Sequence, residues 1–203
     1  MSHEFLTFRI LLYATMLQLF CDIKWVRYMN VPVLETKRLI LRTLTADDAE
    51  AAYLWLSDER VTKYMPYTTY TSISDVRDWL DSLKEEDNYH FGFVLKENGL
   101  LIGSGDIGLN KGFWDFGYNI RYDYWNQGLT TEAAKAMIKY AYDYHGARDF
   151  SSNHAVDNQA SGRVIEKCGL QFYEYGEYRK FDGSEVFRSM LYRAHLEELD
   201  FLL

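Results

Sequence analysis

The chain has 203 residues, a length that suits one domain with a substantial core, or one domain with an appendage. Its 22 Lys and Arg stand against 30 Asp and Glu, and the net charge of −8 would repel a phosphate backbone, which excludes nucleic acid as the expected partner. Cys21, Cys168 and five scattered histidines show neither a disulfide framework nor metal-binding spacing. We therefore expect no metal and a cytoplasmic protein.

The first 28 residues form an apolar extension ahead of a single predicted domain, residues 29–203. Its apolar stretch, residues 5–20, contains Arg9, falls short of the roughly 20 residues that span a bilayer and is followed by no small-residue cleavage site. We expect neither a membrane span nor export. Because Met29 stands directly before the domain, residues 1–28 are a candidate for an extension that is not native. If they are present, we expect them to dock on the domain or across a homodimer.

The domain begins with a strand and two helices. Residues 38–44 alternate and are rich in branched side chains, which predicts the first strand. Helices are predicted over residues 45–56, with Thr45 as N-cap, and over residues 75–86, with Ser74 as N-cap. The stretch KYMPYTTYTS between them predicts a loop.

A meander and a long helix come next. Strands are predicted over residues 89–96, 100–109 and 113–121. The short turns ENG and NKG between them indicate antiparallel pairing. After Gly128, apolar residues fall at helical spacing over residues 129–145, and Gly146 is a glycine C-cap.

The last third of the chain adds three strands and a helix. Residues 147–156 predict a short strand, and residues 157–170 predict a helix that Asp157 or Asn158 caps and Gly169 ends. Two final strands, residues 171–181 and 184–195, are joined by the turn Asp182-Gly183. This order predicts an α+β (α/β three-layer) fold, with a mixed, mainly antiparallel sheet of about seven strands flanked by helices and one parallel crossover.

The segment that points to chemistry is the loop before residues 129–145. A strand that leads through a glycine into a helix N-terminus presents free N–H groups and the positive end of the helix dipole, which suits a phosphate or pyrophosphate. An ordinary turn at Gly128 is the alternative. Neither GxxxxGK[ST] nor GxGxxG occurs, so nucleoside triphosphate and dinucleotide binding lack their usual motifs.

Three ordered segments carry a family resemblance: WDFGYNIRYDYWNQGLTTEA, VDNQASGRVIEKCGL and FDGSEVFRSMLY. Together they resemble the GNAT acetyltransferase superfamily, specifically its RimJ/RimL-like branch of ribosomal-protein-type N-acetyltransferases, from residue 33 to about residue 197. The family's pattern of Gln or Arg, two residues, Gly, one residue, and Gly or Ala lies over Trp125, Gly128 and Thr130. Trp125 and Thr130 depart from that pattern.

The resemblance implies that acetyl-coenzyme A is the donor, held where the fourth and fifth strands splay apart, and that the acceptor is a primary amine of a protein N-terminus or a small molecule. It places coenzyme A on twelve residues: Asn119, Ile120, Arg121, Tyr122, Trp125, Asn126, Gln127, Gly128, Leu129, Thr130, Asn158 and Ser161. Backbone over 119–122 is expected to pair with the pantetheine amides, and N–H groups over 125–130 to hold the pyrophosphate. Asn158 and Ser161 are expected near the thioester, and helix capping by Asn158 is compatible with that role.

The same resemblance suggests catalytic residues for acetyl transfer by direct attack. Asp115 is the first candidate for the base and Asp106 the second; for either, a solvated or ion-paired strand residue is the alternative. Ile165 stands where many family members carry a tyrosine acid, which leaves Ser161 or water to serve the departing thiolate. The reserve candidates are Tyr118 and Tyr173. Aromatic residues flank the segments that shape the acceptor pocket: Tyr64, Tyr67, Tyr70, Phe113 and Trp114.

Two functions from other classes stay open. Because Ile165 removes the usual acid, the protein is alternatively a non-catalytic sensor that binds coenzyme A. The apolar extension over residues 1–28 instead favours an interaction module, in which that segment mediates assembly.

Overall fold

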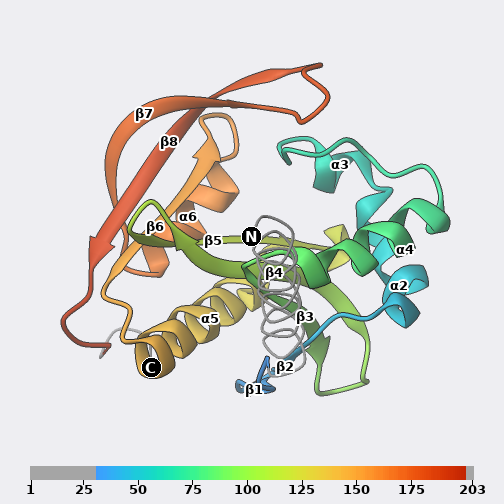
Figure 1. Cartoon of the computed structure of the whole chain (residues 1–203), viewed down its shortest axis with the longest axis horizontal. Helices are drawn as coiled ribbons and strands as arrows, with labels where there is room; N and C mark the ends of the chain where they lie inside the picture. The colour runs from blue at the N-terminus through green and yellow to red at the C-terminus, as the bar shows by residue number, and fades with distance from the viewer. Residues whose placement is uncertain (1–30, 200–203) are drawn as a thin grey trace, which may run out of the picture.

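The computed structural model describes residues 31–199, so the extension predicted over residues 1–28 lies outside the described residues. One eight-stranded sheet runs through the molecule in the order β1-β2-β3-β4-β5-β6-β8-β7 (Figure 1). The strands are β1 (Leu34–Glu35), β2 (Leu39–Arg42), β3 (Tyr89–Leu95), β4 (Leu101–Asn110), β5 (Phe113–Ile120), β6 (Asp149–Ala155), β7 (Gln171–Arg179) and β8 (Val186–His195). β5 and β6 are parallel and the other neighbours antiparallel, which confirms the predicted sheet and adds the short β1.

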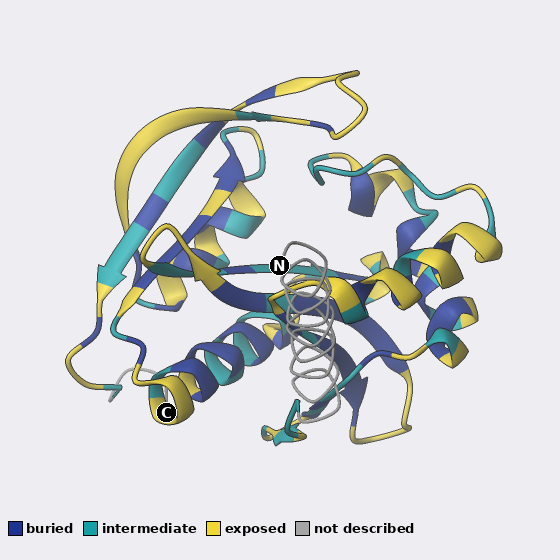
Figure 2. Cartoon of the chain, in the orientation of Figure 1, coloured by how far each residue is buried: buried dark blue, intermediate teal, exposed yellow. Residues whose placement is uncertain are grey.

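Helices cover both faces of this sheet. They are η1 (Ala46–Asp48), α2 (Ala49–Leu56), α3 (Glu59–Thr62), α4 (Ile73–Ser82), η2 (Leu83–Glu85), η3 (Tyr122–Tyr124), α5 (Leu129–His145) and α6 (Gln159–Lys167). One apolar core lies between the sheet, α5 and α6 and includes Phe116, Met137 and Ile165; a second, under α2 and α4, includes Trp55 and Leu80. Figure 2 shows the buried residues along the sheet and on the inner sides of these helices. Among residues 31–199, no helix has the length and apolar character to cross a membrane.

The first predicted helix begins after Thr45 as expected but is split in two, and the second begins at a different serine. The first is split, because Thr45 precedes the 3₁₀ turn η1 and α2 follows that turn. The second begins earlier than expected: Ser72, with an extended backbone, is the N-cap of α4, and its hydroxyl accepts the N–H of Asp75 at 3.1 Å. Ser74, the predicted cap, lies in the first turn. Apolar spacing locates a helix, but the residue where the backbone turns decides which of two neighbouring serines caps it.

α5 begins and ends at glycines in the left-handed region. Gly128, its N-cap, has φ of 75°, and Gly146, its C-cap, has φ of 65°. Residues with a Cβ are strained in this region, so the backbone itself requires glycine at both ends. The predicted beginning and end of this helix are confirmed.

β5 and β6 separate soon after they meet. Their ladder pairs Trp114 with Phe150 and Asp115 with Ser151, and within the described chain it goes no further. β5 continues along β4, whereas β6 continues along β8, and Figure 1 shows the two strands diverging. The predicted splay between the fourth and fifth strands is therefore present, and it opens the middle of the sheet.

Candidate active site

Two cavities meet where β5 and β6 separate. The first, the helix cavity, has a volume of about 300 Å³ and lies between the end of β5, Gly128 at the start of α5, and α6. The second, the sheet cavity, has a volume of about 410 Å³ and lies over Asp106 on β4 and Asp115 on β5. Both volumes fall in or near the range of small-molecule sites. Residues common to both cavities mark the junction: Tyr64, Met65, Tyr118, Asn119, Asn158 and Ser161.

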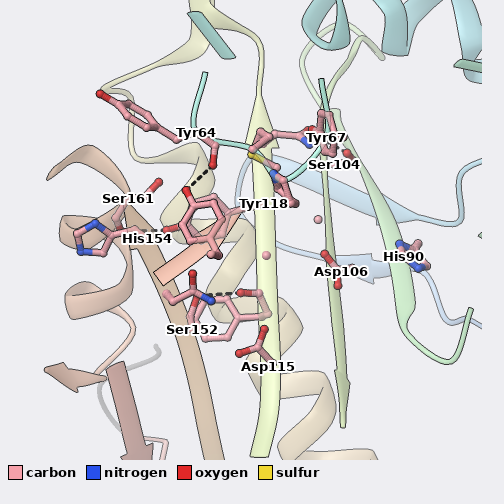
Figure 3. Close-up of a pocket in the computed structure, with 18 of the residues that line it drawn as sticks. Tyr64, Tyr67, His90, Ser104, Asp106, Asp115, Tyr118, Ser152, His154 and Ser161 are labelled. Atoms are coloured by element: carbon pink, nitrogen blue, oxygen red, sulfur yellow. Dashed lines mark hydrogen bonds between the residues drawn. The ribbon is translucent and has the colours of Figure 1, made fainter. Parts of the chain in front are cut away.

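Three polar residues at the junction are joined by hydrogen bonds, and two of them, Tyr118 and Ser161, are labelled in Figure 3. The Tyr118 hydroxyl on β5 donates to the Ser161 carbonyl at 2.9 Å and so ties α6 to the other arm of the splay. Asn158 caps α6: its side-chain oxygen accepts the Ser161 N–H at 3.3 Å, and its amide donates to Ser161 Oγ at 3.0 Å. Because Ser161 Oγ accepts from Asn158, its own proton is available to a third group.

The candidate proton donors differ in where they lie. Burial, then the neighbouring Cys168, raise the pKa of Tyr118, so this phenol gives up its proton less readily than usual and is suited to position α6. Tyr173 lies outside the residues that line either cavity, with the Arg193 guanidinium 3.9 Å from its ring centre. Ile165 is fully buried in the core. Of the groups considered, Ser161 is the one with both the position and a proton to share.

The helix cavity is lined by cations. Arg60, Arg163 and Lys167 line it, and none of its described lining residues is Asp or Glu. The loop before α5 contributes Trp125, Asn126 and Gly128 to the lining, and the first turn of α5 contributes Thr130 and Thr131. Since a helix N-terminus also favours negative charge, this cavity suits an anion.

The loop residues predicted to bind coenzyme A are placed in two ways. The helix cavity brings together Asn119, Ile120, Trp125, Asn126, Gly128, Thr130, Asn158 and Ser161. The other predicted residues do not line it: Arg121 pairs with Asp123, Tyr122 lies under the Arg60 guanidinium, Gln127 bonds to the Asp123 carbonyl, and Leu129 is buried. The Arg121 N–H already donates to the Ile102 carbonyl at 2.8 Å. The Trp125 indole donates to the Ile120 carbonyl at 2.9 Å and fixes the end of β5.

A network of ion pairs and hydrogen bonds that sequence reasoning missed supports the loop before α5. Arg38 contacts Glu132 at 2.7 Å and donates to the Gln127 carbonyl at 2.9 Å, while the Thr36 hydroxyl donates to Glu132 at 2.6 Å. Burial raises the pKa of Glu132, but the bonds from Thr36 and Arg38 outweigh burial and lower it overall. Glu132 therefore stays ionised in the first turn of α5, and Arg38 balances its charge. No local pattern links residues so far apart in sequence.

Replacing Arg38 with Met should loosen this loop. We expect the Kd for coenzyme A to rise about fivefold, which corresponds to about 1 kcal/mol for a partly exposed ion pair and one carbonyl bond. Isothermal titration calorimetry measures it. The matched control is Lys96→Met, which removes a nearby ion pair with Glu35 (2.9 Å) that does not touch the loop. Equal Kd values in the two variants would contradict a role for Arg38.

The sheet cavity carries the opposite charge. Its lining contains Glu86, Asp106 and Asp115, with His90 beside them, and no Lys or Arg among its described lining residues. Asp106 stands opposite Gly117 in the ladder, diagonal to Asp115 on the neighbouring strand (Figure 3). A side chain at Gly117 would crowd Asp106, since its Cβ would lie 3.0 Å from a carboxylate oxygen. This cavity suits a cation.

Burial dominates the titration of its carboxyl groups. Burial raises the pKa of Asp115 to about 6; the Ser151 hydroxyl, which donates to Asp115 at 2.7 Å, opposes this shift, and the charge of Asp106 adds a smaller upward shift. Burial also raises the pKa of Asp106, whose carboxylate accepts from Asn88 at 2.8 Å. A carboxyl with a pKa near neutrality is suited to accept a proton and release it again.

Some of the predicted aromatic residues reach this cavity. Tyr64 and Tyr67 line it, and the Tyr67 hydroxyl accepts from the Asn119 amide at 2.8 Å. Tyr70, Phe113 and Trp114 are not among its lining residues. The structure adds lining residues from β6 that sequence reasoning missed, including buried His154. His154 packs so closely on α6 that a Cβ at Gly162 would lie 2.8 Å from its Nε2.

Comparison with known proteins identifies the family of this chain. A model of the acetyltransferase (GNAT) domain matches residues 38–171. The chain belongs to the GNAT acetyltransferase family. It is 29% identical over 149 residues to the uncharacterised N-acetyltransferase YoaA of Bacillus subtilis, covering 69% of this chain and 83% of that one. It also matches the crystal structure of a GNAT-family acetyltransferase from Bacillus anthracis, with a TM-score of 0.74, 25% identity, and coverage of 82% of this chain and all of that chain.

A more distant solved structure shows the same fold with its donor. The microcin C7 self-immunity acetyltransferase MccE, in complex with acetyl-CoA and AMP, matches with a TM-score of 0.68 and 16% identity over 79% of this chain and 94% of that chain. The family model and the curated relatives named as N-acetyltransferases show that the protein is an acetyl-CoA-dependent N-acetyltransferase. The helix cavity fits such a donor, because its cations, and the glycine-initiated N-terminus of α5 beside them, match the phosphates of coenzyme A.

Proposed function

We propose that the protein acetylates a primary amine by direct attack, with the donor in the helix cavity and the acceptor in the sheet cavity. The observation that supports this is the opposed charge of the two cavities, Arg60, Arg163 and Lys167 on one side and Asp106 and Asp115 on the other. Coenzyme A is an anion, and an amine is a cation at neutral pH. The two partners then meet at the junction.

Asp115 is the proposed base. It takes a proton from the incoming ammonium, directly or through water, and the freed nitrogen attacks the acetyl carbonyl carbon. As the N–C bond forms and the C–S bond breaks, the nitrogen gives its second proton to water, the departing thiolate takes one proton from water, and Asp115 returns its proton to the solvent. Because Asp115 titrates near pH 6, it is mostly ionised at neutral pH and can receive a proton without holding it permanently.

Ser161 is proposed to assist the departing sulfur. Asn158 donates to Ser161 Oγ, which orients the hydroxyl so that its proton can be shared with a thiolate at the junction. Water supplies the proton that the sulfur finally carries. Ser161 and water together take the role of proton donor that a tyrosine has in many family members at the position of Ile165. We further propose, from the sequence motifs, that the enzyme belongs to the RimJ/RimL-like branch and acts in the cytoplasm; a homodimer remains its proposed assembly.

A thiol-release assay tests the proposal. Acetyl-CoA is offered with a panel of primary amines: peptides with varied N-termini, polyamines, aminoglycosides and simple alkyl and aryl amines. We expect thiol release that depends on the amine, with acetyl-amide products confirmed by mass spectrometry. Tight coenzyme A binding without thiol release across the panel would favour the sensor instead.

Ser161→Ala should slow the chemical step. We expect kcat to fall roughly thirtyfold, which corresponds to about 2 kcal/mol for a hydrogen bond to a charged group. The Kd for coenzyme A should stay within about twofold. Ser82→Ala, at the end of α4, is the control, since its hydroxyl only bonds to the nearby Trp79 carbonyl. An unchanged kcat in Ser161→Ala would leave water as the sole proton source.

A further inference from the structure

Two segments far apart in sequence meet over the sheet cavity. One is the loop between α3 and α4, which carries Tyr64, Met65, Pro66 and Tyr67; the other is the tip of the β7–β8 hairpin, residues 178–187. Figure 1 shows the hairpin reaching across the molecule toward α3. Each segment supplies lining residues to the cavity, so whatever joins the two segments also fixes the shape of its wall.

Lys180 joins them. The residue is 9% exposed, and its ammonium donates to the carbonyls of Thr62, Met65 and Tyr67, each at 3.2 Å. An ammonium has three N–H groups, and all three are used on backbone carbonyls, one at the end of α3 and two in the loop that follows it. Removing a charge from water is costly unless such partners compensate for it, so these bonds depend on the two segments staying together.

Two further hydrogen bonds join the same two segments. The Tyr178 hydroxyl donates to the Tyr64 carbonyl at 2.6 Å, and the Phe181 N–H donates to the Pro66 carbonyl at 2.7 Å. We call these two bonds and the three from Lys180 the Lys180 clasp. Tyr178 and Phe181 line the cavity from the hairpin side. In each loop residue from 64 to 67 the carbonyl accepts one bond of the clasp, and each of these residues also lines the cavity.

We propose that Lys180 is a positioning residue that holds the wall of the acceptor cavity closed and thereby limits the size of the amine that enters. The inference rests on the proposed function, because it assigns the sheet cavity to the acceptor. Lys180 is not among the residues that line the cavity, so it acts through the backbone that it holds. With the clasp intact, a cavity of about 410 Å³ admits compact amines.

Lys180→Met tests the proposal, because Met keeps most of the apolar length and removes the three donors. The probes form a graded series of primary amines: ethylamine, phenethylamine, spermidine, a tetrapeptide and kanamycin. We expect KM for the compact amines that the wild type accepts to rise roughly tenfold, because the loop must then be ordered at each binding event. kcat should change little. The ratio of kcat/KM for compact amines to kcat/KM for bulky amines should fall.

The control variants distinguish an effect on the wall of the acceptor cavity from a general loss of stability. Lys139→Met removes a lysine on α5 that is ion-paired with Asp143 at 2.6 Å, away from the cavity, and should leave the amine series unchanged. Lys180→Arg keeps the charge and several donors and should restore part of the selectivity. If Lys180→Met fails to fold, Tyr178→Phe removes one clasp bond and should shift the series in the same direction by a smaller factor.

Each outcome of this experiment decides the matter. If Lys180→Met, or Tyr178→Phe where Lys180→Met does not fold, still acetylates amines with the selectivity of the wild type, the inference is overturned and the proposed function stands. A fall in kcat and in coenzyme A affinity, with the amine preference preserved, also overturns it and leaves Lys180 a general structural residue. Absence of amine-dependent thiol release in the wild type overturns the proposed function and, with it, this inference.

Discussion

Asp115→Asn is expected to reduce kcat/KM at pH 7.5 by about 10²-fold to 10³-fold, the range typical of a lost general base. The substitution keeps the shape of the side chain and an oxygen that can accept the Ser151 hydroxyl, but it removes the group that receives the proton. Steady-state kinetics with the best amine of the panel measures the loss. The Kd for coenzyme A should be unchanged, because Asp115 lines only the sheet cavity.

The pH dependence of kcat/KM shows which carboxyl group acts as the base. With Asp115 titrating at about 6, the wild-type kcat/KM should rise with pH up to that value and level off above it, since only the carboxylate accepts a proton. In Asp115→Asn this rise should disappear. Asp106→Asn is the matched control for the second candidate: it should keep the rise, shifted to lower pH, because the negative charge that raises the pKa of Asp115 is gone. Disappearance of the rise in Asp106→Asn alone would transfer the role to Asp106.

The same substitution should not weaken the fold. The folded pKa of Asp115, about 6, lies above its ordinary value of 3.8, so between these two values the folded chain holds a proton that the unfolded chain has released. Stability therefore falls as pH rises through this window and stays lower above it. Asparagine carries no charge, and we expect Asp115→Asn to be more stable at pH 7 by roughly 2 kcal/mol. A less stable, inactive variant would point to a structural role for Asp115.

Local signals explain why much of the fold could be predicted. Alternating side chains mark the strands, and the change from loop to helical spacing marks α5, whose glycines at positions 128 and 146 are demanded by the backbone. The splay was implied by the family resemblance, and the ladder between β5 and β6 has only two residue pairs among the described residues. Capping was less secure, since Ser72 and Ser74 are both suitable residues and only the path of the backbone selects Ser72.

The site was harder to predict because its decisive contacts are long-range. The carboxyl of Asp115 depends on Ser151 and Asp106, and the wall of its cavity depends on Lys180, which is 118 residues from Thr62. A lysine at the end of a predicted strand carries no sign that it will be buried. Net charge was also a poor guide, because the overall −8 conceals a cationic cavity beside an anionic one.

Gly128→Val and Gly146→Val form a matched pair at the two ends of α5. Both glycines have positive φ, so each substitution should destabilise the fold by about 2 kcal/mol through backbone strain alone. Neither meets a steric barrier inside the protein: the nearest atom to a Cβ at Gly128 is Arg38 Nη2 at 3.6 Å, and nothing lies within 4 Å at Gly146. Chemical denaturation should report similar losses.

The Kd for coenzyme A should distinguish Gly128→Val from Gly146→Val. Gly128 lines the helix cavity, and we expect a side chain there to keep the pyrophosphate from approaching the backbone of this loop as closely as glycine allows. We expect its Kd to rise about thirtyfold, which corresponds to about 2 kcal/mol for weakened bonds to a charged group, whereas Gly146→Val should leave Kd unchanged. If both variants lose affinity in proportion to stability, Gly128 only shapes the helix. A loss confined to Gly128→Val assigns the anion to this end of α5, because backbone strain is common to both variants and proximity to the cavity is not.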